Sequence, residues 1–286
     1  MPKTLSTELA RTRLDANQSR HPRHIERDYR RKLERRVSTI GDFIQDAIDR
    51  FLLAERDEIN ELARQDTRDQ VIRGISRVMS GVRLTVEGQW TEREDRDLAE
   101  SVAEDVDRFE TGQTARQWSA VKGVDPIFSD RAIEPVIREF TAQNLQLIRD
   151  IGPELTGQVE DHLVDAVRKG QRAEDFQEIV QDRLGVAESR AQLIARDQIG
   201  SMTGRITEAR QQELGVTEYI WRTAGDERVV GNPAGLYPEP TDESMHGDHW
   251  ARDGVTFKWS DPPPDGHAGR AIQCRCTADP VVEDLL

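Results

Sequence analysis

Tyr219-Ile220-Trp221 lies near the start of the stretch around which the rest of this 286-residue chain is interpreted, Thr217 to Val282. A polar turn and a loop rich in proline and glycine follow, and the motif Gln273-Cys274-Arg275-Cys276 lies near the end. The helical period of 3.6 residues, present before Thr217, is absent here. We therefore expect short strands and loops, which form a small, loop-rich α+β cap on a mainly helical protein.

The N-terminal and central parts of the chain carry helical patterns. Apolar residues recur at steps of mostly three and four from Tyr29 to about Leu62, which predicts one long amphipathic helix. Val82 to Gln89 is ambiguous, because its alternating apolar residues also suit a short strand. Thr91 and Glu94 have the spacing of a capping box, which predicts the start of a helix that ends near Gly112.

Glycines subdivide the helical stretch between residues 130 and 215. Gly152-Pro153 and Gly185 predict helix ends inside it, and Gly170 and Gly215 predict two more. Helices joined by such short connections pack as antiparallel neighbours. We expect a basic, mobile arm at 1–28, a helical region at 29–122, and a domain at 123–286 with helices at 130–215 and the cap at 217–282.

Charge is distributed unevenly along the chain. Residues 1–36 hold eleven Lys or Arg and five Asp or Glu, whereas the whole chain has a net charge of -14. Two interpretations of this basic arm stay open: a solvated tail, or a contact with an anionic partner such as DNA. The candidate DNA-contacting residues are Arg20, Arg23, Arg27, Arg30, Arg31, Lys32, Arg35 and Arg36.

The composition bounds the class of protein. Only 36% of the residues are hydrophobic and 33% are charged, which favours long solvent-exposed helices or a subunit of an assembly. No apolar run is long enough for a membrane span, and no apolar core of a signal peptide follows Met1. We expect a soluble protein that is made and kept in a cytosol, without a membrane partner.

The two cysteines suggest a metal site. Cys274 and Cys276 are two residues apart, so a disulfide between them would be strained. Zinc prefers four nitrogen or sulfur ligands, and His249 with either His246 or His267 would complete such a set. Two interpretations stay open: a structural zinc that holds the cap together, or two thiols that pack as small apolar groups beside Trp259, with no cofactor.

Other residues of the cap are interpreted as structural. Asp226 follows a glycine and is expected to accept a hydrogen bond from its own turn, with Arg228 beside it. Tyr219, Trp221 and Trp259, together with Phe257 and Gly254, are expected to form the core and turns of the cap.

An enzymatic interpretation is the alternative for the same loop. His246, His249 and Asp226 have the side chains that a base, an acid and an orienting group require. Such a set would suit a metal- or His-dependent hydrolase or nuclease. We expect the structural interpretation to hold, and hence no catalytic residue.

Six signals follow one another over more than half of the chain. They are Gly123-Val124-Asp125 with Asn144-Leu145; Lys169-Gly170 with Leu184-Gly185 and Ser189-Arg190-Ala191; Ile194-Ala195-Arg196-Asp197; Gly215 with Tyr219-Ile220-Trp221 and Asp226-Glu227-Arg228; His249 with Gly254; and Cys274-Arg275-Cys276 with Pro280-Val281. In this order they resemble the phage Mu F-like head morphogenesis family, the minor capsid proteins of tailed phages. Asp197-Gln198 departs from that family, many of whose members have Thr-Glu there.

The resemblance implies a virion component, present in few copies inside the head near the portal and in the host cytoplasm during assembly. It implies a role in head morphogenesis, with the portal protein and other head or scaffold proteins as partners, and in some members a part in DNA packaging or ejection. It implies no enzymatic activity and no small-molecule substrate. The alternatives are a DNA-contacting internal virion protein ejected with the genome, and the hydrolase described above.

Overall fold

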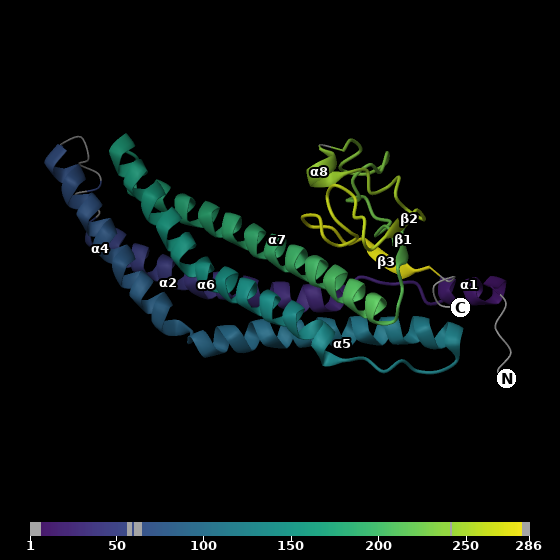
Figure 1. Ribbon diagram of the computed structural model, residues 1–286. Helices are drawn as coiled ribbons and strands as arrows, with labels where there is room; N and C mark the ends of the chain where they lie inside the picture. The colour runs from purple at the N-terminus through teal and green to yellow at the C-terminus, as the bar shows by residue number, and fades with distance from the viewer. Residues whose placement is uncertain (1–6, 56–58, 60–64, 241, 282–286) are drawn as a thin grey trace. The chain divides into compact units, whose positions relative to one another are not determined.

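The computed structural model describes residues 7–55, 59, 65–240 and 242–281, and it confirms a mainly helical protein with a small sheet. Residues 1–6 of the expected arm and part of the helix expected to reach Leu62 lie outside the described residues. The helices and strands (Figure 1) are α1 (Thr7–Asp15), α2 (Arg23–Ala54), α4 (Gln65–Gln89), α5 (Glu92–Lys122), α6 (Asp130–Lys169), α7 (Ala173–Glu213), β1 (Glu218–Arg222), α8 (Glu243–His246), β2 (Thr256–Lys258) and β3 (Thr277–Pro280).

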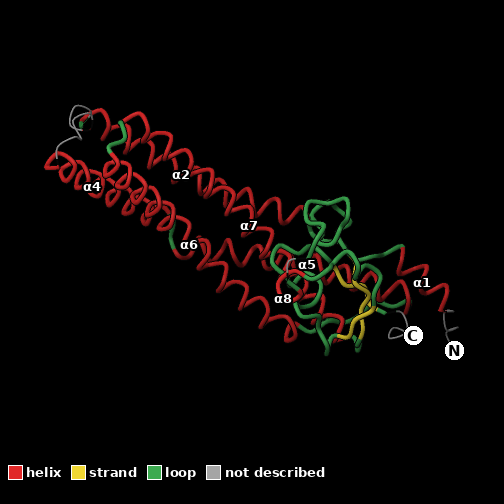
Figure 2. Tube along the Cα trace, turned by 90° about the horizontal axis from the view of Figure 1, so that it is seen from above, coloured by secondary structure: helices red, strands yellow, loops and turns green. Residues whose placement is uncertain are grey.

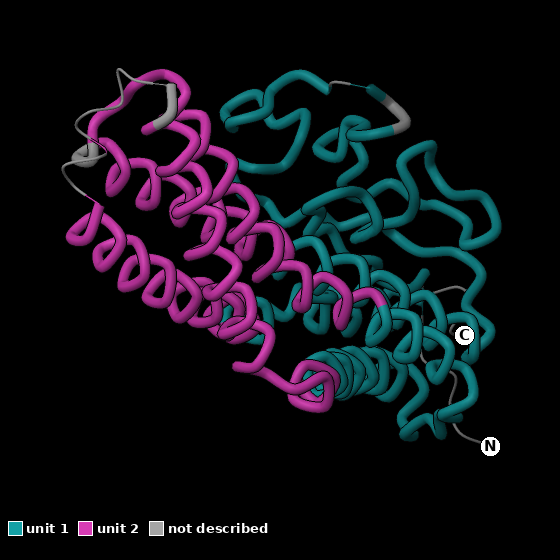
Figure 3. Tube along the Cα trace, turned by 90° about the vertical axis from the view of Figure 1, so that its left-hand side faces the viewer, with its two compact units in different colours: residues 1–27, 99–142, 195–286 teal, residues 28–98, 143–194 magenta. Residues whose placement is uncertain are grey.

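The chain folds into two compact units, each assembled from segments that are far apart in the sequence (Figure 3). Unit 1 consists of residues 1–27, 99–142 and 195–286, and unit 2 consists of residues 28–98 and 143–194. The cap and the ends of several helices thus belong to unit 1. Among the described residues, no helix combines the length and the apolar composition that a membrane-crossing segment requires.

Unit 2 is a bundle of helical segments with an aliphatic core. The stripe predicted for the long helix is buried on α2, where Ile40, Ile44 and Ile48 have no exposed surface. Glycines allow close approach of neighbouring helices: a Cβ at Gly41 would lie 2.7 Å from the Leu184 side chain. Figure 2 shows these helices running side by side. The amphipathic helix predicted from Tyr29 is confirmed, although it begins earlier, at Arg23, and ends at Ala54 rather than near Leu62.

The ambiguous segment Val82–Gln89 is helical and forms the end of α4. Val82 and Val86 are buried, whereas Leu84 between them is 71% exposed. Residues four apart share one face of a helix, and this stripe continues the one formed by Ile75 and Met79. The helical period therefore decides between the two interpretations.

Three predicted helix ends are wrong. Helix α5 continues past Gly112 to Lys122, because buried polar side chains rather than apolar ones extend its contact face. Helix α6 continues through Gly152-Pro153, since Ile151 and Leu155 on either side are buried in phase with each other. Helix α7 continues through Gly185, where a glycine costs only about 1 kcal/mol relative to alanine.

Other local signals are confirmed. Glu94 donates its N–H to the Thr91 hydroxyl over 3.2 Å, and its carboxylate accepts the Thr91 N–H over 2.8 Å, which is the predicted capping box. Gly170 and Gly215 have φ values of 73° and 80° and follow the ends of α6 and α7. These left-handed positions favour glycine, which explains why the two helices end there.

The described part of residues 1–28, which were expected to form a mobile arm, contains regular structure. Helix α1 buries Ala10 and Leu14, and α2 already begins at Arg23. Between them, the Ser19 N–H donates to Asp279 Oδ1 over 2.6 Å, and its hydroxyl donates to the Ala278 carbonyl over 3.1 Å. These contacts join residues about 260 positions apart, so no local sequence period could indicate them.

The cap within unit 1 is built on a three-stranded antiparallel sheet with the order β2-β1-β3 (Figure 2, strands in yellow). Its core contains Tyr219, Trp221 and Trp259, with Phe257 packed against them, which confirms the predicted aromatic core. Two glycines of α7 allow the loops of the cap to approach closely. A Cβ at Gly200 would lie 2.3 Å from the Cys274 carbonyl oxygen, and one at Gly204 would lie 2.5 Å from that of Ala268.

Candidate metal centre

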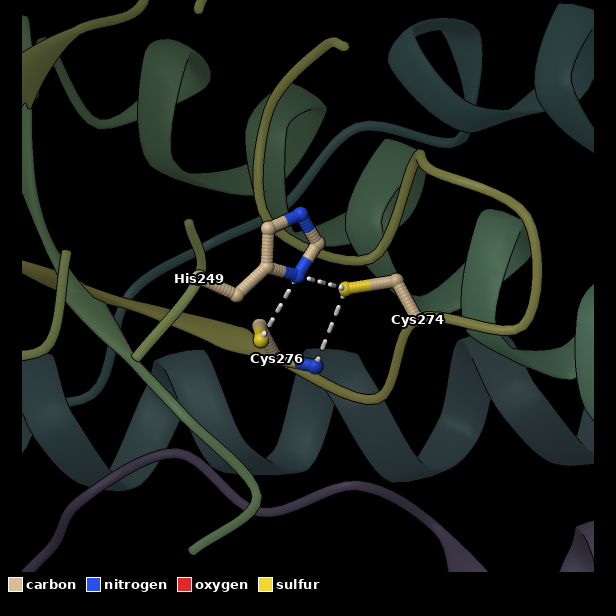
Figure 4. A group of neighbouring side chains, drawn as sticks. All are labelled: His249, Cys274 and Cys276. Atoms are coloured by element: carbon tan, nitrogen blue, oxygen red, sulfur yellow. Dashed lines mark hydrogen bonds between the residues drawn. The ribbon is translucent and has the colours of Figure 1, made fainter. Parts of the chain in front are cut away.

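Three side chains of the cap converge on one small volume (Figure 4). His249 Nδ1 lies 3.5 Å from Cys274 Sγ and 3.6 Å from Cys276 Sγ. The possible ligand atoms of the three residues all lie within 4.8 Å of one another. All three residues are buried, with exposed fractions of 4%, 7% and 3%. The structure therefore brings together three of the residues that the sequence nominated for zinc.

The backbone around the cysteines is fixed by α7. Gln273 has a φ of 58°, in the left-handed region, immediately before Cys274. Its N–H donates to Asp197 Oδ1 over 3.0 Å, and its carbonyl accepts from Arg196 Nε over 2.9 Å. Cys276 directly precedes β3, which pairs with β1. The two thiols are thus presented by a turn that is held at one end by a helix and at the other by the sheet.

The imidazole of His249 is oriented by a buried carboxylate. His249 Nε2 lies 2.8 Å from Asp265 Oδ2, and Asp265 also accepts hydrogen bonds from Arg252 and from the Gly247 N–H. Burial opposes ionisation of Asp265, but these hydrogen bonds outweigh it and hold its pKa below the usual value. The carboxylate fixes the ring so that Nδ1 faces the sulfur atoms.

The same contacts control the protonation of the cluster. Burial alone would lower the pKa of His249, but the hydrogen bonds to Asp265 and Cys274 raise it to about 9. The pKa of Cys274 is lowered, mainly by its contact with Cys276 and then by His249, although burial opposes this. A thiolate is the form of cysteine that binds metals and acts as a nucleophile.

Two further histidines were nominated as a fourth ligand. His267 cannot serve, because its Nδ1 lies 3.0 Å from the Tyr219 hydroxyl and its Nε2 lies 3.2 Å from the Trp259 carbonyl oxygen. His246, at the end of α8, lies on the wall of the same pocket as the cluster but outside the group of atoms within 4.8 Å. The described residues thus supply three close ligands.

A pocket of about 260 Å³ opens beside the cluster. His249, Cys274 and Cys276 form part of its wall, and Arg196, Arg228, Arg275, His246, Asp226 and Glu239 contribute charged or titratable groups. Burial lowers the pKa of Arg196, and the nearby positive charges of Arg275 and Arg228 lower it further. The cluster therefore faces a pocket in which arginine side chains are crowded together.

The residues expected to be structural largely behave as predicted. The Arg228 N–H donates to Asp226 Oδ1 over 3.1 Å, which is the turn expected after Gly225. Gly254 has a φ of 77°, and its N–H donates to the Trp221 carbonyl over 2.8 Å. Asp226, His246 and His249 line the same pocket, but the carboxylate bonded to His249 belongs to Asp265 rather than Asp226.

The basic residues nominated for DNA differ in their surroundings. Arg36 is buried and bonded to Asp95 over 2.5 Å, so its guanidinium is engaged within unit 2. Arg23, Arg30 and Arg31 are 42% to 63% exposed and lie within 3.6 Å of carboxylate oxygens. The remaining exposed side chains of the set are Arg20, Arg27, Lys32 and Arg35.

Several residues of the site carry only weak sequence signals. Asp265 lies in a Pro-Pro-Pro-Asp-Gly turn, which gives no indication that it contacts His249. Gly200 and Gly204 are four residues apart, a spacing that places both on one helix face, but this spacing alone does not indicate a contact with the cap.

Glu26 of α2 is bonded to Arg275, which lies between the two cysteines in the sequence. Burial opposes its ionisation, yet hydrogen bonds from His21 and Arg275 lower its pKa to about 2.

Comparison with known proteins identifies the central segment of the chain. Residues 157–237 match the sequence profile of the family described as Phage Mu protein F like protein. An uncharacterized protein of Haemophilus influenzae is 30% identical over 149 residues, which are 52% of this chain and 30% of that relative. No solved structure matches the chain. The resemblance to the Mu F-like family is thus confirmed over residues 157–237.

Proposed function

We propose that this protein is a minor head protein that acts in phage head morphogenesis and associates with the portal. The observation that carries the proposal is the family match over residues 157–237, which extends from α6 through α7 and β1 into the loop of the cap. The matched segment therefore includes the helix that holds the cap, rather than an isolated loop. The proposed site of action is the interior of the head, near the portal.

The architecture supports a role in an assembly. The long helices present many charged side chains to solvent, and the chain is strongly acidic. A protein of this composition is soluble before assembly and can add to a larger structure through helix faces. Asp265 rather than Asp226 is bonded to His249, which weakens the hydrolase alternative in the form that the sequence suggested.

The test is association with the portal protein encoded by the same phage genome. The two proteins are co-expressed, purified through a tag on the portal protein and passed over a size-exclusion column. We expect co-migration, and we expect purified heads to contain this chain by mass spectrometry. A portal protein from an unrelated phage is the matched control. The proposal is wrong if the chain is absent from purified heads and if it migrates separately from the portal protein on the column.

A contact with DNA is a second candidate, favoured by the exposure of Arg31, Lys32 and Arg35 on α2. Each lysine or arginine that contacts a phosphate releases counterions, so the affinity should fall steeply with salt. Replacing Arg31, Lys32 and Arg35 by glutamine should weaken binding to a labelled duplex and flatten its salt dependence. Arg73→Gln with Arg77→Gln, two exposed residues of α4, is the matched control. Equal binding by both variants would remove this candidate.

A further inference from the structure

We propose that this protein binds one zinc ion through His249 Nδ1, Cys274 Sγ and Cys276 Sγ, and that the fourth coordination position opens on the arginine-lined pocket. The inference is independent of the proposed role in the phage head. It rests on the spacing of the three donor atoms, on the group that orients the histidine, and on the wall of the adjoining pocket.

The spacing of the donor atoms fits a tetrahedral zinc site. With Zn–S distances of about 2.3 Å and a Zn–N distance of about 2.0 Å, a tetrahedral angle separates nitrogen from sulfur by about 3.5 Å. The observed separations of His249 Nδ1 from the two sulfur atoms are 3.5 and 3.6 Å. One imidazole N–H can donate to only one thiolate at full strength, whereas a shared metal needs both sulfur atoms at equal distances. The nearly equal separations therefore favour a metal over a simple hydrogen bond, and dashed lines in Figure 4 join His249 Nδ1 to both sulfur atoms.

The surroundings of His249 are those of a metal ligand. A metal-binding histidine commonly donates its other ring N–H to a carboxylate, which fixes the ring and makes the ligating nitrogen more basic. Asp265 accepts this hydrogen bond over 2.8 Å, and it is itself held by the Arg252 side chain and the Gly247 N–H. The Cys276 N–H lies 3.3 Å from Cys274 Sγ, which stabilises a thiolate at that position.

The fourth position is not filled by a side chain of the cluster. His267 is engaged at both ring nitrogens, and His246 lies outside the group of close ligands. Two thiolates and a neutral imidazole leave a bound zinc ion without net charge. The guanidinium groups of Arg196 and Arg228 on the pocket wall then favour water or a small anion as the fourth ligand.

Such a zinc ion would stabilise the cap. His249 follows α8, whereas the cysteines lead into β3, so the ion would join two loops separated by 25 residues. The core of the cap is small, and a structural metal adds folding free energy to a domain of this kind. Removing the ion should therefore lower the melting temperature of the cap.

The first test uses the full-length wild-type protein. We expect elemental analysis to find one zinc per chain. After exchange for Co²⁺, we expect a thiolate-to-cobalt charge-transfer band and the visible absorption of a tetrahedral site. Added azide should shift this absorption, because the fourth position is open. Folded protein that takes up neither Zn²⁺ nor Co²⁺ overturns the proposal. If azide leaves the spectrum unchanged, the claim that the fourth coordination position is open is wrong.

The second test uses variants. Cys274→Ser, Cys276→Ser and His249→Ala should each weaken Zn²⁺ affinity by at least about a hundredfold, and Asp265→Asn by about 10- to 100-fold. His246→Ala is the matched control, from the same pocket wall, and should retain one zinc per chain. Loss of zinc in that variant would mean that His246 is the fourth ligand and would overturn the open position.

A nucleophilic cysteine is the competing explanation of the same cluster. Cys274, His249 and Asp265 would then form a thiolate, imidazolium and carboxylate set in which Cys276 only donates hydrogen bonds to the thiolate, as a serine at that position also could. Rapid alkylation of Cys274 by iodoacetamide in the purified protein, unchanged in Cys276→Ser, would support that explanation and overturn the zinc site. We expect bound zinc to protect both thiols, and protection to be lost in Cys276→Ser.

Discussion

The core of unit 2 and the core of the cap are built from different kinds of side chain. Unit 2 buries long aliphatic stripes on its helices, of which Ile40, Ile44 and Ile48 are typical. The cap instead buries three aromatic side chains with alanines and the two cysteines. An aliphatic stripe distributes stability over many equivalent contacts. The cap depends on a few close approaches and on polar groups at defined positions. Its stability should therefore be more sensitive to the replacement of a single residue.

The largest effect is expected from a deletion in the aliphatic core. Ile44→Ala should lower the free energy of unfolding by about 3 kcal/mol, because it removes buried methyl groups and leaves a cavity. Leu53→Ala, on the same helix but 85% exposed, should change it by less than about 0.5 kcal/mol. Chemical denaturation followed by far-ultraviolet circular dichroism measures both. Equal effects of the two substitutions would contradict the aliphatic-core description.

The second prediction tests the close approach on which the cap depends. Gly200→Ala should cost about 2 kcal/mol, because the new Cβ meets a backbone carbonyl that cannot move aside easily. Gly185→Ala, also in α7 but with no atom within 4 Å of the new Cβ, should stabilise the protein by up to about 1 kcal/mol. Near-ultraviolet circular dichroism during denaturation reports the cap aromatics. A gain of stability in both variants would show that the approach is not tight.

The third prediction concerns a buried polar group in unit 1. Glu110 is buried on α5 and accepts hydrogen bonds from Gln113 and Thr207, and burial raises its pKa from 4.5 to about 8. Between these values the folded protein holds a proton that the unfolded chain has lost, so stability should fall as pH rises from about 5 to 8. Glu110→Gln should remove this dependence and add about 1 to 3 kcal/mol at pH 8. Denaturation at several pH values measures how the free energy of unfolding changes with pH.

The control for that experiment is Glu104→Gln, on the exposed face of the same helix. This substitution should leave the pH dependence of the wild-type protein in place. If Glu110→Gln also leaves the dependence in place, the buried carboxyl group is not its cause.

The smallest effect is expected at a helix start in unit 2. Thr91→Ala removes the hydroxyl that accepts the Glu94 N–H and should cost about 1 kcal/mol. Thr85→Ala, on the exposed face of α4, removes a hydroxyl that bonds only to the preceding turn and should be neutral within about 0.5 kcal/mol. Thermal denaturation distinguishes the two. A neutral Thr91→Ala would show that the capping box contributes little.

The sequence predicted features that depend on residues a few positions apart. The stripe from Leu33 to Ile48, the capping box at Thr91 and the glycines that end α6 and α7 are all confirmed. Each is a consequence of helix geometry, which repeats over short distances. Of the residues nominated for zinc, His249, Cys274 and Cys276 lie close together in the structure, whereas His267 is bonded elsewhere.

The same local reasoning failed where distant contacts outweigh propensity. Gly112 and Gly185 do not end their helices, since the contacts of the residues beyond them favour continuation. Residues 1–28 were expected to be mobile because they lack a helical apolar stripe. Ser19 and Glu26 instead bond to the strand and turn near Cys276, which lie about 250 residues later.

By itself the sequence determined a mainly helical protein with a small cap, the positions of its aliphatic stripes, and the family of its central segment. The fold class and the stripes follow from local periodicity, and the family follows from motifs that occur in a fixed order along the chain. Only the tertiary structure decided that Asp265 rather than Asp226 orients His249, that His267 is already engaged, and that α7 fixes the turn before Cys274. Those relations are distances between residues far apart in sequence, and they exist only once the chain has folded.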